Sequence, residues 1–164
     1  MFIKAELHID SKVYTLLEFS HHYTQPINKV HRPIGNMQGG FWQISLEATQ
    51  DMTFTEWAAH PTMLKNVKIV VYPATFGKSY TFALYDVFCV SNTTHFHHSS
   101  TEPVQTHLVF SPAQIAINGE MQFQKLWKVT DVLNQVVATS IAEEEEEEEE
   151  VVTEGYLPKI TFSL

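Results

Sequence analysis

The histidines at positions 95, 97 and 98 are the residues of this chain best suited to metal chemistry. They lie in the segment 92–103, NTTHFHHSSTEP. In a β-strand, His95 and His97 would share a face, and paired imidazoles at that spacing bind zinc or copper. No cysteine or nearby carboxylate completes a ligand set, since Glu102 is the nearest acid. We therefore interpret these histidines as part of a polar loop, and we predict no metal site and no cofactor.

Four other residues carry groups that could react. Asp86 and the single cysteine, Cys89, lie in the apolar run 79–91, SYTFALYDVFCVS. We interpret Asp86 as hydrogen-bonded or facing solvent, and Cys89 as a small core residue. A lone cysteine excludes an internal disulfide. His21 and His22 are adjacent, so a strand would place them on opposite faces, and we interpret both as surface or lumen residues.

Motifs that carry catalysis are missing from the sequence. It has no Gly-x-Ser-x-Gly nucleophile pattern, no phosphate-binding glycine loop and no Gly-x-Gly-x-x-Gly pattern. Paired carboxylates of the kind used in glycoside hydrolysis are not indicated either. We therefore predict that the chain is not an enzyme and that its working residues form a surface.

The negative charge of the chain is concentrated near its C-terminus. The net charge is −9, but 143–150 is a run of glutamates and Glu154 follows it. The preceding residues, 1–142, are close to neutral. No basic patch favours nucleic-acid binding, and no apolar run reaches the roughly 18 residues of a membrane helix. The N-terminus alternates polar and apolar residues, which is not typical of a secretory signal peptide.

Most elements that would position a surface are predicted to be strands. In 3–9, Ile3, Ala5, Leu7 and Ile9 alternate with polar residues, a pattern with the period of two of a half-buried strand. Alternation also predicts strands over 13–23, 41–49 and 104–117, and the apolar runs 67–72 and 79–91 predict two more. Tight turns are predicted at 10–12 and at Asn118-Gly119. The fold class is therefore mainly β, with one short helix.

Two helices are predicted from local patterns. Thr53 and Glu56 have capping-box spacing, which predicts a short helix over 54–60 that ends before Pro61. The helical spacing of apolar residues in 129–137 predicts an amphipathic helix. The glutamate run then reads as a solvated linker before an apolar end. We thus divide the chain into a β-rich domain, 1–120, and a C-terminal extension, 121–164.

The segment 25–40 is the strongest candidate for an interaction loop. It contains Pro26, Pro33, Gly35, Gly39 and Gly40, a density that argues against regular structure. It is also longer than most loops in compact domains, and such loops tend to carry contacts.

The ordered set of these features resembles the Hcp/TssD family of type VI secretion tube proteins, in its Bacteroidetes form. The matching features, in order, are 2–7 (FIKAEL), 10–14 (DSKVY), 25–27 (QPI), Arg32-Pro33, Gly39-Gly40, 45–47 (SLE), 51–54 (DMTF), Glu56-Trp57 and 115–117 (IAI). The resemblance covers roughly residues 2–120. It implies that residues 1–120 form an antiparallel β-barrel with one short α-helix. It also implies a structural protein whose barrels assemble into hexameric rings, which stack into an inner tube inside a contractile sheath.

Several expectations follow from this resemblance. The 25–40 loop would contact neighbouring protomers or the next ring, with Pro26, Arg32, Pro33, Gly39 and Gly40 at the interface. The partners would be other copies of the chain and the sheath, spike and effector proteins, with no nucleic acid and no membrane insertion. The protein would be cytoplasmic until firing and then secreted without a signal peptide.

Two features leave an alternative open. The extension 121–164 and the histidine-rich segment depart from the pattern of the family, which leaves open whether the chain is the bulk tube subunit or a specialised paralogue. The alternative function is a stand-alone β-barrel binding module with a ligand or metal site at the histidine-rich loop.

Overall fold

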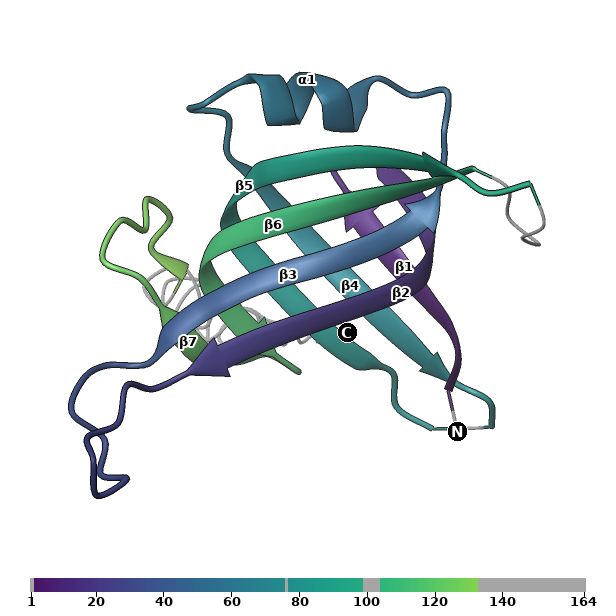
Figure 1. The fold of residues 1–164 in the computed structure, drawn as a ribbon. Coiled ribbons are helices and arrows are strands. Elements are labelled where there is room, and N and C mark those ends of the chain that lie inside the picture. The colour runs from purple at the N-terminus through teal and green to yellow at the C-terminus, as the bar shows by residue number, and fades with distance from the viewer. Residues whose placement is uncertain (1, 76, 99–103, 133–164) are drawn as a thin grey trace, which may run out of the picture. The chain divides into compact units, whose positions relative to one another are not determined.

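The computed structural model describes residues 2–75, 77–98 and 104–132, which form seven strands and one helix (Figure 1). The elements, in chain order, are β1 (Phe2–Ile9), β2 (Lys12–Thr24), β3 (Gln38–Glu47), α1 (Thr53–Ala59), β4 (Lys65–Pro73), β5 (Tyr80–Phe96), β6 (Val104–Ile117) and β7 (Glu120–Gln124). The predicted mainly β class with one short helix is confirmed for these residues.

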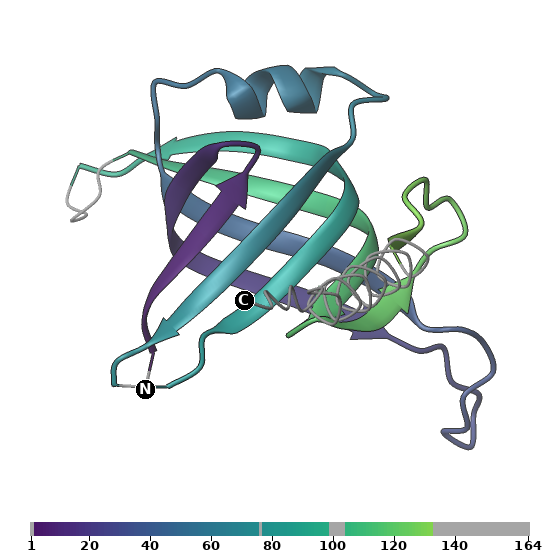
Figure 2. The ribbon, with the colours of Figure 1, turned by 180° about the vertical axis from the view of Figure 1, so that it is seen from behind.

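The strands form one antiparallel sheet that closes on itself. Their order is β3-β2-β1-β4-β5-β6-β7, and an additional pairing between β3 and β6 closes the barrel (Figures 1 and 2). Strand β6 makes this closure possible because it is long: its first half pairs with β3 and its last residues pair with β7. The sequence did not predict β7, whose alternation is short and polar.

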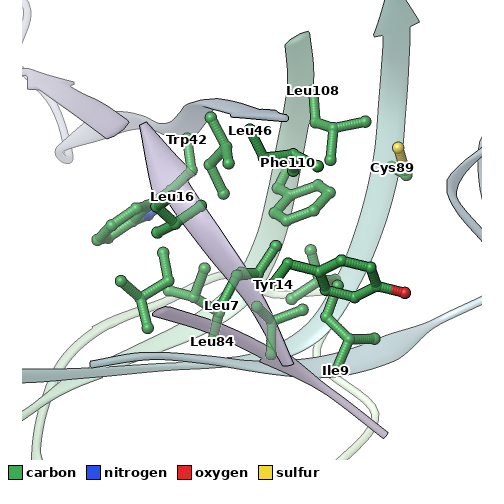
Figure 3. Packing of buried hydrophobic residues seen from close by; sticks show 14 of the residues in the cluster. Leu7, Ile9, Tyr14, Leu16, Trp42, Leu46, Leu84, Cys89, Leu108 and Phe110 are labelled. Atoms are coloured by element: carbon green, nitrogen blue, oxygen red, sulfur yellow. The ribbon is translucent and has the colours of Figure 1, made fainter. Parts of the chain in front are cut away.

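Side chains that alternate along the strands fill the barrel. Figure 3 shows part of this cluster, to which β1, β2, β3, β5 and β6 all contribute. Trp42, Leu84 and Phe110 are fully buried. The core includes Cys89, as predicted, and burial raises the pKa of its thiol to about 11. That thiol therefore stays protonated and takes the part of a small apolar side chain.

Helix α1 packs on the barrel through two aromatic side chains. Phe54 lies 4.9 Å from the Tyr14 ring and Trp57 lies 4.8 Å from the Phe110 ring, measured between ring centres. The Trp57 indole also donates a 3.0 Å hydrogen bond to the carbonyl of Met63. The helix is thereby attached to the barrel at both of its turns.

The predicted capping box at the start of α1 is wrong. The N-cap is Met52, which makes no side-chain capping bond, and Thr53 is already the first helical residue. Asp51 replaces the box: its Oδ1 accepts from the Thr53 backbone N–H at 2.8 Å and from the Thr53 hydroxyl. Its Oδ2 accepts from Lys12 and Tyr14, and the Lys12 bond is the largest cause of the lowered pKa of Asp51.

Strand β5 changes direction at Asp86. This residue has a φ of 51°, a left-handed conformation that aspartate tolerates better than most residues. Its buried carboxylate accepts hydrogen bonds from the Gln114 side chain at 3.2 Å and from the Val129 backbone N–H at 2.9 Å. The interpretation of Asp86 as hydrogen-bonded is confirmed.

The compact unit that contains the barrel runs through Val129. The predicted amphipathic helix, glutamate linker and apolar end lie for the most part beyond residue 132, outside the described residues, and remain predictions. Within the described part of the chain, no helix has the length and apolar character that crossing a bilayer requires.

Candidate assembly surface

The predicted interface residues fall into two groups. Pro26, Arg32 and Pro33 lie in the connection between β2 and β3, residues 25–37, which we call the β2–β3 loop. This loop projects from the barrel away from α1 (Figures 1 and 2). Gly39 and Gly40 lie at the start of β3 instead. The predicted single loop over 25–40 is therefore a shorter loop followed by the first residues of a strand.

Hydrogen bonds within the β2–β3 loop hold its shape. Ile27 and Pro33 form an isolated antiparallel bridge, and the backbone N–H of Ile34 donates to the Pro26 carbonyl at 2.9 Å. Inside this small hairpin, the Asn28 side-chain oxygen accepts from the backbone N–H groups of Val30 and Arg32, both at 3.0 Å. The loop is thus ordered from within.

The same loop exposes aliphatic side chains that the sequence did not single out. Val30, at the tip, is 77% exposed, and Ile34 is 64% exposed. Ile27 and Met37 are also exposed. Aliphatic residues in a segment rich in proline and glycine could have indicated this, because such residues normally mark strands or helices. Held in a fixed hairpin and open to water, they form an apolar contact surface.

The two glycines shape the base of the loop. Gly39 has a φ of 105°, and a Cβ there would lie 2.6 Å from the carbonyl oxygen of His22. Gly40 has a φ of 73° and is buried, and a Cβ there would lie 3.2–3.3 Å from the rings of Phe123 and Tyr23. Only glycine meets both demands without strain. These residues set the direction in which the chain leaves the loop.

A second exposed segment lies beside the base of the loop. We call residues 125–129 the C-terminal strap. The Lys125 backbone N–H donates to the carbonyl of Ala113 at 2.7 Å, and its ammonium group donates to the Ser111 hydroxyl at 3.2 Å. The Trp127 ring lies 5.3 Å from the Phe88 ring. The bond from Val129 to Asp86 completes the attachment of the strap to β5 and β6.

The strap presents a cation among aromatic rings. The Lys125 ammonium lies 5.3 Å from the centre of the Phe41 ring and 5.4 Å from that of Trp127. Partial burial lowers the pKa of Lys125. Phe41, Leu126 and Trp127 keep exposed apolar surface. Since Phe41 directly follows Gly40, the strap and the base of the loop meet at this aromatic group.

The histidines predicted as a polar loop are placed differently by the structure. Strand β5 runs through Phe96, so His95 belongs to a strand, whereas His97 and His98 follow it. The neighbour of His95 is His107 of β6, with ring centres 4.8 Å apart. No group of three or more potential metal ligands occurs among the described residues.

His21 and His22 lie on opposite faces of β2, as predicted. Of the two, His21 is only partly exposed, because its ring stacks on Trp42 at 4.3 Å and meets Phe82 at 5.7 Å. Burial lowers the pKa of His21. His22 is exposed. A register shift between His22 and Tyr23 separates this part of β2 from the loop.

The family comparison covers most of the chain. The family profile described as "Hemolysin coregulated protein Hcp (TssD)" matches residues 1–128, which include the barrel, the β2–β3 loop and most of the strap. In a comparison with curated proteins, none matches significantly.

Solved structures share the fold at low sequence identity. Hcp1 from Flavobacterium johnsoniae has a TM-score of 0.69 at 20% identity, and the match covers 74% of this chain and 100% of that chain. Hcp1 from the E. coli EAEC 042 pathovar gives 0.62 at 11% identity, with 76% and 100% covered. The PVC sheath/tube terminator of an extracellular contractile injection system gives 0.51 at 10% identity, with 70% and 92% covered.

Proposed function

Because this chain belongs to the Hcp (TssD) family, we propose that it is a structural tube protein of a type VI, or contractile injection, secretion system. Its protomers assemble into hexameric rings, which stack into the inner tube and carry effectors. Sheath and spike proteins are its further partners. It stays in the cytoplasm until firing and then leaves the cell with the tube. With the extension 121–164, it acts as a specialised paralogue of the bulk subunit.

The observation that carries this proposal is the exposed apolar surface of an internally ordered loop. Burying apolar surface stabilises a contact by about 25 cal/mol per Å², and Val30 and Ile34 leave most of theirs in water. A hairpin held by its own hydrogen bonds loses little conformational freedom on binding. The β2–β3 loop is therefore suited to insert into a neighbouring copy, with Arg32 and the two prolines in the contact and the glycines fixing its base.

The strand pairing also favours self-assembly. Barrel closure covers the edges of β1 through β6, but within the described residues β7 pairs on one side only. Unpaired edges invite pairing with another chain and are usually covered. A head-to-tail contact that closes gives a ring, and a second such contact along the axis gives a stack. The loop and the β7 edge supply two separate surfaces for these two contacts.

Electron microscopy of the purified full-length chain tests the proposal. We expect six-fold rings with a central hole, and stacks of rings at higher concentration. A chain that ends at Val129 controls for a block by the extension, because the compact barrel unit runs through that residue. Monomers at high concentration from both chains, measured by light scattering, would overturn the proposal.

A substitution at the loop tip tests the role of the loop. Val30→Asp places a charge where apolar contact is proposed, so stacks should be lost while rings and thermal stability are kept. Met52→Asp is the matched control, because Met52 is a comparably exposed apolar side chain away from the loop. Stacking that is equally sensitive to both substitutions would contradict a specific role for the loop.

A further inference from the structure

Strands β5 and β6 bring two histidines together on the outer face of the barrel. In the antiparallel register, His95 is opposite Gln105 and His107 is opposite Thr93, so the two histidines are diagonal neighbours. The alternate residues of β6, Thr106 and Leu108, are buried, which places His107 on the opposite face. The imidazole rings meet edge to face, with centres 4.8 Å apart and planes at 82°.

We infer that His95 and His107 form a binding site for a divalent transition-metal ion that prefers imidazole ligands, Cu²⁺ or Zn²⁺. The site belongs to the single protomer and does not depend on ring assembly. It differs from the sequence-based possibility of a His95 and His97 pair, because the partner of His95 comes from the neighbouring strand.

The ring separation fits two ligands of one ion. A metal bound at 2.0–2.1 Å from an imidazole nitrogen lies roughly 3.2 Å from the ring centre. Two such rings have centres about 4.5 Å apart at a square-planar angle of 90° and about 5.2 Å apart at a tetrahedral angle. The observed 4.8 Å lies between these values. His95 is exposed, so its ring can turn a nitrogen toward the ion at low cost.

Ser45 on β3 prepares His107 for this role. Residue 45 pairs with 107 across β3 and β6, and the Ser45 hydroxyl lies 2.8 Å from Nδ1 of His107. A hydroxyl that accepts from Nδ1–H holds the neutral tautomer whose Nε2 lone pair is free to bind metal. Ligating histidines commonly have a hydrogen bond of this kind on their other nitrogen. Ser45 is a positioning residue and not a ligand.

The surroundings are compatible with a bound cation. The side chains at the paired positions carry no positive charge: Glu18 is opposite Ser45, Glu47 is opposite Gln105, and Thr93 is opposite His107. Glu47 adds negative potential from the strand next to His107, and Glu18 adds it from two strands away. Because the histidines lie on an open face, water completes the coordination of the ion. We therefore expect an exchangeable site rather than a structural one.

Calorimetric titration of the full-length protein tests this inference. Titration with either Cu²⁺ or Zn²⁺ should show a binding component with a stoichiometry of one ion per chain. This component should be lost in His107→Ala and in His95→Ala. Ca²⁺ and Mg²⁺ bind carboxylates but not imidazole, so they report separately on the glutamate run 143–150. His98→Ala is the matched control and should keep the component. Retention in His107→Ala, or loss in His98→Ala, would overturn the site.

The role of Ser45 in holding the tautomer of His107 can be tested separately. Ser45→Ala should weaken Cu²⁺ binding about 10-fold, and Ser45→Thr, which keeps the hydroxyl, should restore it. The electron paramagnetic resonance spectrum of the Cu²⁺-loaded protein should show coupling to two imidazole nitrogens in the parent chain and to one in His95→Ala. A spectrum with oxygen ligands alone would refute the inference, even if calorimetry showed binding.

Discussion

The barrel core and the β2–β3 loop use the same kinds of residue in opposite ways. In the core, Trp42 and Trp57 have no exposed surface, whereas Val30 at the loop tip is 77% exposed. Burial on folding gives the barrel its stability. In the loop, the apolar surface stays exposed, so the free energy of burying it can be gained on contact with another molecule. The position of an apolar residue therefore decides whether it supports the fold or the proposed assembly.

The two regions also satisfy their backbone groups differently. Barrel strands pair with strands distant in sequence, as in the closure between β3 and β6. The loop satisfies its groups locally, within 25–35, through Asn28 and the Ile27–Pro33 bridge. A change in the barrel should therefore lower the stability of the whole domain, and a change in the loop should act locally.

The largest effect is expected for Trp57→Ala. This substitution removes the ring that packs on Phe110 and the indole that donates to the Met63 carbonyl. We expect the free energy of unfolding to fall by about 3–5 kcal/mol, as measured by urea denaturation. Trp57→Phe keeps an aromatic ring and should cost less. A loss below about 1 kcal/mol for the alanine variant would show that α1 is only loosely attached.

Asp86→Ala should have the next largest effect, because it removes the acceptor that ties the strap to the barrel. Gln114 and the Val129 backbone would lose a buried partner, and alanine is less tolerant of the positive φ. The expected loss is about 1–3 kcal/mol, with faster amide hydrogen exchange at Val129. Asp86→Asn keeps an acceptor and the left-handed conformation and should recover most of the stability. Equal losses in both variants would point to the charge itself.

Periodicity made most of the fold predictable. The alternation in residues 3–9 and 104–117 correctly predicted β1 and β6, and the Asn118-Gly119 pair correctly predicted the turn before β7. In β1, the same alternation correctly placed Leu7 and Ile9 on the buried face. The ordered set of features also placed the chain in its family, which the profile match over 1–128 confirms.

Features that depend on tertiary neighbours were not predictable. Thr53 matched a capping pattern, but the residue that bonds to the helix start is Asp51. Lys12 and Tyr14, on a strand distant in sequence, donate hydrogen bonds that hold the Asp51 carboxylate there. His95 was grouped with His97 by spacing, whereas the register of β5 and β6 makes it a diagonal neighbour of His107, and the two rings are in contact. In each case, a local pattern was outweighed by a contact between residues far apart in sequence.

A smaller effect is expected from pH at His21, which lies between the two regions. Burial against Trp42 lowers the folded-state pKa of His21, so the unfolded chain takes up the proton first. Its contribution to stability is full above the unfolded pKa and is lost as pH falls from about 7 toward 5. His21→Phe should flatten this part of the thermal stability profile. His22→Phe, on the exposed face, should not, and an equal flattening by both would contradict burial as the cause.

The smallest effect on stability is expected for Asn28→Ala, which makes it the most direct test of the comparison. The variant removes the side-chain oxygen that accepts from Val30 and Arg32. Because these bonds close only the loop, the global free energy of unfolding should change by no more than about 0.5 kcal/mol. Amide hydrogen exchange at Val30 and Arg32 should nevertheless accelerate, and the stacking of rings of the protein should weaken, since a frayed loop must be ordered again on contact.

Asn36→Ala, in the same loop, is the matched control and should leave both the exchange rates and the stacking unchanged. A large loss of global stability in Asn28→Ala would mean that the loop unfolds cooperatively with the barrel. The barrel core and the β2–β3 loop could then not be assigned separate roles, one in the stability of the fold and the other in assembly.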